Sequence, residues 1–250
     1  VNTGGELVQI VCGAPNAQAG LKTPLAQPGA KLPGGVKIKK TKLRGVVSQG
    51  MLCSAAELTL SDDHDGLLAL PEDAPVGEAI EEYLDLNDQL IEIGLTPNRA
   101  DCLGVLGVAR DLAVTTESAL TEPPIKTVSP SIEDVFPVEV LSAAKCPRYL
   151  GRVIRNVDIS KTLPLFMVER LRRAGIRSLD AVVDSTNYVM LELGQPLHAF
   201  DLDSLQGGIR VREAGPDECI TLLDGEERTL SDGTLGIADN KKALAMAGIM

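Results

Sequence analysis

The sequence predicts a multi-domain α+β protein, in which part of a small β-barrel is followed by a mixed α/β module. Three observations lead to this fold class. The chain has 250 residues, and a domain usually contains about 100–200, so two domains are expected. Short apolar runs divided by glycine and proline fill residues 1–80, which is typical of strands joined by turns. Further along, helical patterns alternate with strand patterns.

Composition is typical of a globular protein of the reducing cytoplasm. Apolar residues make up 44% of the chain and charged residues 24%, which is sufficient for buried cores. No run approaches the ~18 apolar residues of a membrane span, and no signal-peptide pattern is present, so we expect no membrane contact. The five scattered cysteines form no CxxC pair, which argues against a disulfide framework and against a zinc site.

The first domain is expected to contain strands at ELVQIVC (6–12) and VKIKKTKLRG (36–45), with MLCSAAEL (51–58) compatible with a short helix. This β pattern favours a small barrel, for which the OB-fold is the leading candidate. Few strands are visible, the chain starts at Val1 rather than Met, and it stops inside an apolar run. We therefore expect an excerpt of a longer protein, with the first barrel strands preceding Val1.

Five cations without an acidic neighbour lie on the strand expected at 36–45: Lys37, Lys39, Lys40, Lys42 and Arg44. In a strand the first two share one face and the other three share the opposite face. Such a group can bind phosphate, but lysines also protect the edges of ordinary sheets, and the residues alone leave both interpretations open. Residues 1–82 contain no Phe, Tyr or Trp, so RNA binding there would follow the backbone without stacking on bases.

The net charge of −11 conceals a strong segregation of charge along the chain. Residues 1–56 carry seven Lys or Arg and one acid, whereas residues 57–92 carry twelve acids and no Lys or Arg. Between 145 and 177 nine basic residues face two acidic ones. Because local fields decide binding, the acidic total does not exclude nucleic acid as a partner.

Beyond the acidic stretch, a helix is expected at CLGVLGVARDLAV (102–114), capped near Asn98. The Pro-, Ser- and Thr-rich residues 116–137 are predicted to form a linker. The module that follows is expected to begin with basic strands within 146–159.

A second helix is predicted over 163–175, ending where Gly175 takes a left-handed conformation. Later strands are expected at IRVRE (209–213) and within 219–230, where Asp224-Gly225 indicates a hairpin turn. Helices among strands with a late hairpin indicate a mixed α/β domain.

Residues 61–72 have part of the spacing of a calcium-binding loop, with Asp63 and Asp65 at ligand positions. The first position is Ser61, which supplies no carboxylate, and two prolines prevent the exit helix. We favour a solvated acidic turn, with His64 at the surface.

Catalytic motifs of the common hydrolases and nucleotide-binding enzymes are absent from the sequence, and two histidines offer no Ser-His-Asp order. Hydrolysis here would need a positioned water. The candidate is His198 in NYVMLELGQPLHAFD, on the turn after an apolar helical run that stops at Gly194. A lone histidine at a helix exit is more often a structural hydrogen-bond partner, but sites are also built on loops at the ends of elements.

Arg177 lies just before the same helical segment. A straight helix over 179–193 would be ~22 Å long and would hold Arg177 far from His198. The polar cluster at 184–187 is a poor helix interior and a good cap, however, so the helix is predicted to begin near 185 and the two residues to approach each other.

Motifs in nearly every part of the chain resemble the β subunit of bacterial phenylalanyl-tRNA synthetase. The matching stretches are IVCGAPNAQAGLKTPLAQPGAKLPG, KTKLRGVVSQGMLCS, LTPNRADCLGVLGVARDLA, CPRYLGRVI, LRRAGIRSLDAVVDSTNYVMLELGQPLHAFD and ALAMAGI. The resemblance implies three parts: a tRNA-binding OB-fold domain at 1–82, incomplete at its N-terminus, a scaffold segment and linker at 83–143, and a B3/B4 editing domain at 144–250, incomplete at its C-terminus.

The same resemblance implies that Arg177 and His198 line a pocket that removes tyrosine wrongly attached to phenylalanine tRNA, with no certain catalytic residue and no metal. It also implies a catalytic α subunit as partner in an α2β2 assembly, tRNA as ligand, and ATP and Mg²⁺ bound by the whole enzyme but not by this excerpt. The alternative is a stand-alone OB-fold module for RNA binding or assembly. The stretches RRAGIRS and GQPLHAFD argue against it, because a bare binding module needs no editing pocket.

Overall fold

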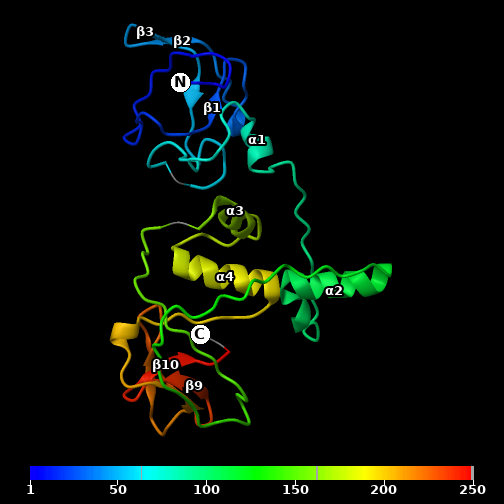
Figure 1. Ribbon diagram of the computed structural model, residues 1–250, viewed down its shortest axis with the longest axis vertical. Helices are drawn as coiled ribbons and strands as arrows, with labels where there is room; N and C mark the ends of the chain where they lie inside the picture. The colour runs from blue at the N-terminus through cyan, green and yellow to red at the C-terminus, as the bar shows by residue number, and fades with distance from the viewer. Residues whose placement is uncertain (63, 162, 249–250) are drawn as a thin grey trace. The chain divides into compact units, whose positions relative to one another are not determined.

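A computed structural model describes residues 1–62, 64–161 and 163–248 of the chain (Figure 1). The chain forms two compact units that alternate along the sequence. The first unit contains Val1–Ala100 and Thr162–Asp180, and the second contains Asp101–Lys161 and Ala181–Met250. Every helix in the described parts of the chain is too short or too polar to span a lipid bilayer.

The first unit contains two small antiparallel sheets. Strand β1 (Leu25–Ala26) pairs with β4 (Met51–Leu52), and β2 (Thr41–Leu43) pairs with β3 (Val46–Ser48), while a 3-10 turn, η1, spans Pro33–Gly35. No closed barrel is present among the described residues. The core of this unit is built on four buried side chains, Ala26, Leu32, Ile38 and Cys53.

Three predictions for the first unit are wrong in extent or type. Residues 6–12 form no strand but one isolated bridge at Leu7, and only part of 36–45 is a strand. The expected helix at 51–58 is replaced by β4 and a single turn. Ser54 and Glu57 do exchange capping hydrogen bonds, but Thr59 adopts a φ of 55°, which ends the turn before a helix can propagate.

Helix α3 (Leu165–Arg173) ends as the sequence predicts. Gly175 has a φ of 77° and donates its N–H to Arg172 O, while the N–H of Ile176 bonds to Leu171 O. These two bonds form a Schellman motif, in which a glycine free of Cβ strain closes the last turn. The side chain of Leu171 is fully buried.

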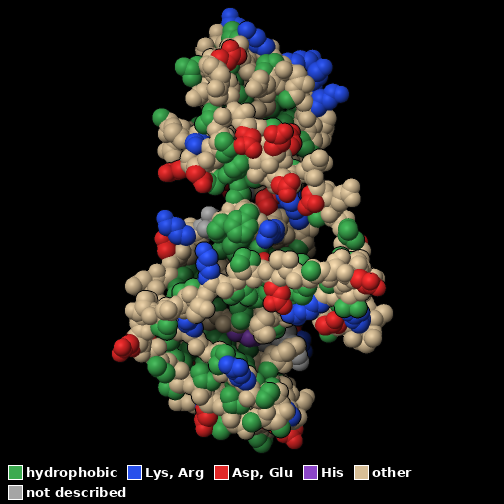
Figure 2. Space-filling model, turned by 45° about the vertical axis from the view of Figure 1, so that its right-hand side comes forward, with side chains coloured by type: hydrophobic (Ala, Val, Ile, Leu, Met, Phe, Trp, Pro, Cys, Tyr) green, Lys and Arg blue, Asp and Glu red, His purple; other side chains and the backbone are tan. Residues whose placement is uncertain are grey.

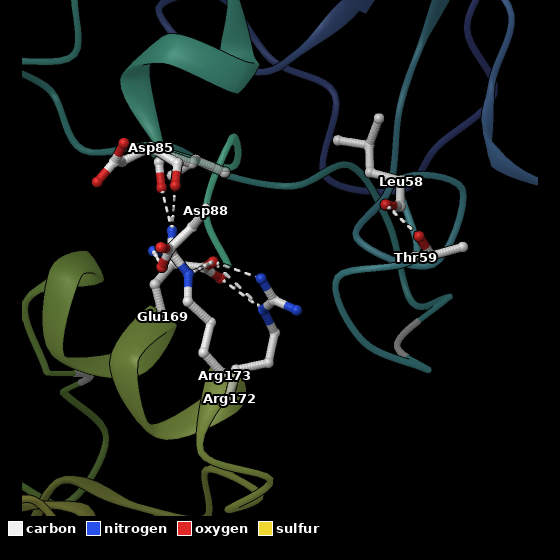
Figure 3. Close-up of polar contacts among 8 residues, drawn as sticks. Leu58, Thr59, Asp85, Asp88, Glu169, Arg172 and Arg173 are labelled. Atoms are coloured by element: carbon white, nitrogen blue, oxygen red, sulfur yellow. Dashed lines mark hydrogen bonds and ion pairs between the residues drawn. The ribbon is translucent and has the colours of Figure 1, made fainter. Parts of the chain in front are cut away.

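Arg173 joins α3 to the short helix α1 (Ile80–Tyr83) within the first unit (Figure 3). Its Nη2 donates to the carbonyl oxygens of Leu84 and Asp85, and its Nη1 lies 2.9 Å from the Asp88 carboxylate. A cation at the C-terminal carbonyls of a helix is favourable, because those groups lack partners within the helix.

The second unit is a mixed α/β structure. Its four-stranded sheet has the order β10-β9-β6-β5, with bounds Ala243–Met246, Leu235–Ala238, Ile209–Glu213 and Val138–Val140. The pair β5–β6 is parallel and the other pairs are antiparallel. Ile209, Val211, Ile237 and Ala245 form its main buried cluster.

Helices and a hairpin complete this unit. The 3-10 turn η2 (Ala100–Leu103) precedes α2 (Val105–Thr116), α4 spans Ala181–Leu193, and a further 3-10 turn, η3, spans Leu202–Ser204. Strands β7 (Cys219–Thr221) and β8 (Glu227–Thr229) form the hairpin.

Several predictions for the second unit are confirmed. Strand β6 has the predicted bounds, and the β7–β8 hairpin turns at Asp224-Gly225, where Gly225 has a φ of 83°. Residues 118–137 contain no helix or strand, but they lie within the second compact unit, and their role as a linker between domains stays a prediction.

The strands predicted within 146–159 are absent from the structure. Two arginines of this stretch bond instead to the irregular segment before β5. Arg152 donates to Val128 O, and Arg155 pairs with the Asp134 carboxylate at 2.7 Å. Asn156 also has a φ of 56°, which no strand accommodates.

Both helix starts differ from the prediction. Helix α2 begins after Gly104 rather than near Asn98, and α4 begins at Ala181 rather than near 185. The polar cluster is tolerated inside α4 because the Ser185 hydroxyl donates to Ala181 O and the Thr186 hydroxyl donates to Val183 O.

The carboxylate of Asp239 ties the β9–β10 turn to the loop before β6. It is 1% exposed and accepts hydrogen bonds from the backbone N–H groups of Lys241, Lys242 and Gln206 at 2.7, 2.8 and 3.2 Å. Burial alone raises the pKa of Asp239, but the three N–H donors and the charge of Lys242 outweigh burial and hold the pKa below its ordinary value of 3.8.

Helices α2 and α4 pack closely in the second unit (Figure 1). A Cβ atom placed on Gly104 would lie 2.5 Å from the backbone nitrogen of Gly194 and 2.7 Å from its Cα. Because the obstruction is backbone, no side-chain rotation can relieve it. Gly104 therefore allows the start of α2 to touch the end of α4.

Replacing Asp239 by Asn should lower the free energy of unfolding by about 1–3 kcal/mol at neutral pH, because the amide group of Asn replaces Oδ2 and leaves the Gln206 N–H without its acceptor. The folded pKa lies below the unfolded pKa, so the stabilisation is complete above about pH 4 and is lost as the pH falls through the folded value. Urea unfolding should show a smaller difference in the free energy of unfolding between wild type and Asp239→Asn at pH 3 than at pH 7. Asp232→Asn, at an exposed residue, is the control. An equal difference at both pH values would contradict this account.

Replacing Gly104 by Ala should cost about 1–3 kcal/mol of stability, as overpacking does. Gly151→Ala is the matched control, because a Cβ there meets Val138 Cγ2 at an ordinary 3.6 Å. Thermal unfolding of both variants measures the effect, and equal melting temperatures would show that α2 and α4 can separate without cost.

Candidate nucleic-acid interface and the turn at His198

The basic surface comprises Lys37, Lys39, Lys40, Lys42 and Arg44, and all five side chains are exposed. Ile38 anchors it, because this side chain is buried and its backbone bonds to Gly29 and Ala30. The last cation lies in the two-residue turn between β2 and β3, where Arg44 and Gly45 have φ values of 49° and 87°. These angles indicate a type I′ turn, so Arg44 does not continue the strand that was predicted through it.

Charge on the basic surface is directed at solvent. Among the described residues, no ion pair engages these five cations. Figure 2 shows Lys and Arg side chains at the end of the first unit where β2 and β3 lie, and Asp and Glu side chains farther along the same unit. Exposed cations on this hairpin and on the segment just before it suit a polyanion, because they neutralise phosphates and release the counterions condensed on them.

The possible calcium loop at 61–72 receives no support. Asp63 lies outside the residues that the structure describes, and His64 is exposed. In the described parts of the chain, no group of three or more His, Cys, Asp or Glu side chains is arranged to hold a metal ion. A hollow of about 280 Å³ nearby is lined by residues that include Cys12, Ser54, Glu57 and His64. The Ser54 hydroxyl already donates a hydrogen bond to the Glu57 carboxylate.

His198 lies on an exposed turn that is anchored on both sides. The preceding helix α4 ends at Leu193, and Gly194 follows with a φ of 71°. After the histidine, the Asp201 carboxylate accepts hydrogen bonds from Asp203 N and Ser204 Oγ and so begins the 3-10 turn η3. The turn is therefore ordered by its own capping groups.

The imidazole of His198 stacks on Phe200, with the ring centroids 5.8 Å apart and the planes at 17°. Phe200 in turn packs against the buried cluster of the four-stranded sheet. No hydrogen bond of the described residues uses the imidazole nitrogens of His198. The side chain thus has a rigid apolar support and leaves its polar atoms to a ligand or to water, contrary to a purely structural hydrogen-bond role.

Arg177 follows the Schellman end of α3 and is also exposed. It belongs to the first compact unit, whereas His198 belongs to the second. That the two residues approach each other stays a prediction. The helix start near 185 from which it was argued is wrong.

Two residues important for the histidine turn were not singled out from the sequence. Phe200 supports the imidazole, and Gly104 contacts the end of α4 from which the turn departs. The spacing of His198 and Phe200 gives a signal for the first, since residues two apart in an extended segment share a face. Gly104 gives no comparable signal, because the glycine that it touches lies ninety residues later in the chain.

Comparisons with known proteins give matches to two family models and to full-length relatives. Residues 1–79 match the family described as putative tRNA binding domain, and residues 145–250 match the B3/4 domain. Over all 250 residues the chain is 61% identical to the phenylalanine–tRNA ligase beta subunit of Pseudomonas putida, 59% to that of Pectobacterium atrosepticum and 60% to that of Dickeya dadantii. The chain spans about a third of the length of these relatives, 32%, 31% and 31% respectively.

Proposed function

This chain belongs to the family of phenylalanine–tRNA ligase beta subunits, which are aminoacyl-tRNA synthetase subunits, and we propose that it binds tRNA and hydrolyses tyrosine misattached to phenylalanine tRNA. The observation that carries the hydrolytic part is the turn at His198. Within the stretch that matches the B3/4 domain, the exposed imidazole of His198 stacks on Phe200 and forms no hydrogen bond with another described residue.

Editing has a clear physical purpose in such an enzyme. A pocket that accepts phenylalanine cannot strongly reject tyrosine, because tyrosine only adds a hydroxyl group. A second site that removes the wrong amino acid restores accuracy. His198 would hold the ester, the terminal ribose or the attacking water, and Arg177 would contact RNA phosphates.

The three-part division at 1–82, 83–143 and 144–250 belongs to this proposal, with the first part as a portion of an OB-fold domain. Its support is the match of residues 1–79 to the family described as putative tRNA binding domain and the five exposed cations of the basic surface. Because residues 1–82 contain no Phe, Tyr or Trp, binding there would follow the RNA backbone.

The whole protein would work in the cytoplasm with a catalytic α subunit in an α2β2 assembly. The α subunit would hold ATP, Mg²⁺ and phenylalanine. We expect this chain alone to attach no amino acid to tRNA. The alternative, a binding or assembly module without editing, accounts for the hairpin but leaves the exposed histidine turn without a role.

Replacing Lys40 and Lys42 together by Glu should weaken tRNA binding by the whole protein. It should also flatten the dependence of log Kd on log salt, by roughly one unit for each phosphate that a lysine no longer neutralises. Lys126→Glu with Lys241→Glu is the matched control, because it makes the same charge change on exposed residues of the second unit. An unchanged salt slope in the hairpin variant would mean that these lysines only protect a sheet edge.

Replacing His198 by Ala in the whole enzyme should slow deacylation of tyrosyl-tRNA by about 10²–10³-fold if the imidazole stabilises the transition state. Phenylalanine charging should stay nearly intact, because synthesis and editing would occur at separate sites. Single-turnover deacylation and charging assays on the same folded enzyme measure both.

The other histidine supplies the control, since His64 is also exposed and its replacement by Ala should change neither rate. Because slower deacylation leaves more tyrosine on the tRNA, His198→Ala should raise net tyrosine attachment. Arg177→Ala should raise it too, but by less. Deacylation at the normal rate in His198→Ala would refute the editing role, and equal loss of both activities would indicate a structural defect.

A further inference from the structure

We propose that the basic surface binds a paired stem of RNA, with its cations reaching the phosphates of both strands across the shallow groove. This inference rests on the proposed function and specifies which part of an RNA the first unit recognises. It follows from the way the cations are distributed over the two faces of one exposed segment, which leads into the β2–β3 hairpin.

The first pair of cations, Lys37 and Lys39, flanks a buried anchor. Ile38 is 6% exposed, and its N–H donates to Ala30 O while its carbonyl accepts from Gly29 N. Neighbouring residues of an extended chain point to opposite faces, so Lys37 and Lys39 point away from the core that holds Ile38. Both lysines are exposed, which agrees with this placement.

The second pair of cations, Lys40 and Lys42, belongs to the opposite face of the segment. Lys42 lies in β2 and is paired with Val47 of β3, so these two side chains share one face of the hairpin. Lys40 precedes Lys42 by two residues and therefore follows the same face. The register runs without a shift from Thr41 to Leu43, so the backbone that carries Lys42 is regular.

Ser48 fastens the hairpin to the rest of the first unit. Its side chain is 1% exposed, and its Oγ accepts a hydrogen bond from Val11 N and donates one to Gly50 O, both at 3.0 Å. Next to the turn at the other end, Leu43 and Val46 are 46% and 42% exposed. The hairpin is thus held at its base and presents an apolar tip beside its cations.

Cations on two opposite faces fit a duplex better than a single strand. A single strand offers one row of phosphates, and its bases would stack on aromatic side chains, but residues 1–82 contain no Phe, Tyr or Trp. The minor groove of an A-form stem is wide and shallow, and the phosphates of both strands border it. A hairpin with cations on both faces can lie in that groove, where its apolar tip packs on the riboses.

The dependence of log Kd on log salt distinguishes the two modes of binding in the whole protein. Replacing Lys37 and Lys39 by Ala, or Lys40 and Lys42 by Ala, should flatten the slope for a blunt RNA stem by roughly two units each, since each pair neutralises its own phosphates. All four replacements together should flatten it by roughly four units. With a single-stranded RNA of the same length, one pair substitutes for the other, so either double variant should change the slope little.

The matched control is Lys126→Ala with Lys241→Ala, which removes two exposed lysines of the second unit and should leave the slope for the stem unchanged. Leu43→Ser with Val46→Ser should weaken binding of the stem without changing the slope, because it removes apolar contact and no cation. Stem binding unchanged in this variant, together with lost attachment to anionic phospholipid vesicles, would assign the tip to a membrane and overturn the inference.

A slope for the stem that changes with only one of the two lysine pairs would show that the surface meets a single row of phosphates. That result would overturn the inference, as would equal effects of each pair on the stem and on the single strand. Both outcomes leave tRNA binding by the basic surface intact if Lys40→Glu with Lys42→Glu still weakens it. Normal tRNA binding by that variant, with the stem slopes changed as expected, would remove the tRNA role and retain a surface for paired RNA.

Discussion

Two glycines with a left-handed backbone conformation determine where both candidate site residues lie in the fold. Gly175 ends α3 and Gly194 ends α4, each with a φ that a side chain would strain. Because the helices stop there, Arg177 and His198 lie on short exposed segments rather than on helix faces. Each segment leaves a rigid element, so its polar side chain is presented without a long mobile loop.

Local electrostatics differ sharply from the net charge of −11. The basic surface keeps its cations exposed, whereas several arginines elsewhere, such as Arg172 and Arg212, are paired with acidic residues within the fold. Arg212 is held by Glu218 in a bidentate pair at 2.6 and 2.7 Å, and the hydrogen bonds from Arg212 lower the pKa of Glu218. The acidic residues 57–92 belong to the same unit as the hairpin. They would repel RNA from the rest of that unit and thereby orient it toward the cations.

Local signals predicted the parts of the fold that local interactions determine. Gly175 and Asp224-Gly225 mark a helix end and a hairpin, because only particular backbone angles satisfy those turns. Strand β6 was predicted from five residues of alternating pattern. Sequence reasoning failed where the structure of a segment depends on contacts with residues far away in the chain. Residues 146–159 have strand-like composition, yet their arginines bond to the segment before β5. The aromatic support of His198 and the contact of Gly104 with Gly194 likewise depend on packing that no window of sequence contains.

Alternation of the two units along the chain has a consequence for synthesis on the ribosome. Helix α3 supplies buried Leu171 and the arginine that closes α1, but it follows Val1–Ala100 only after the 61 residues of Asp101–Lys161. At about 5–20 residues per second, translation of that stretch takes roughly 3–12 s. During this interval the carbonyl groups of Leu84 and Asp85 at the end of α1 lack the arginine that later binds them. The first unit therefore gains the last of its contacts only when Thr162–Asp180 has been synthesised, and a ribosome that pauses within Asp101–Lys161 delays that step.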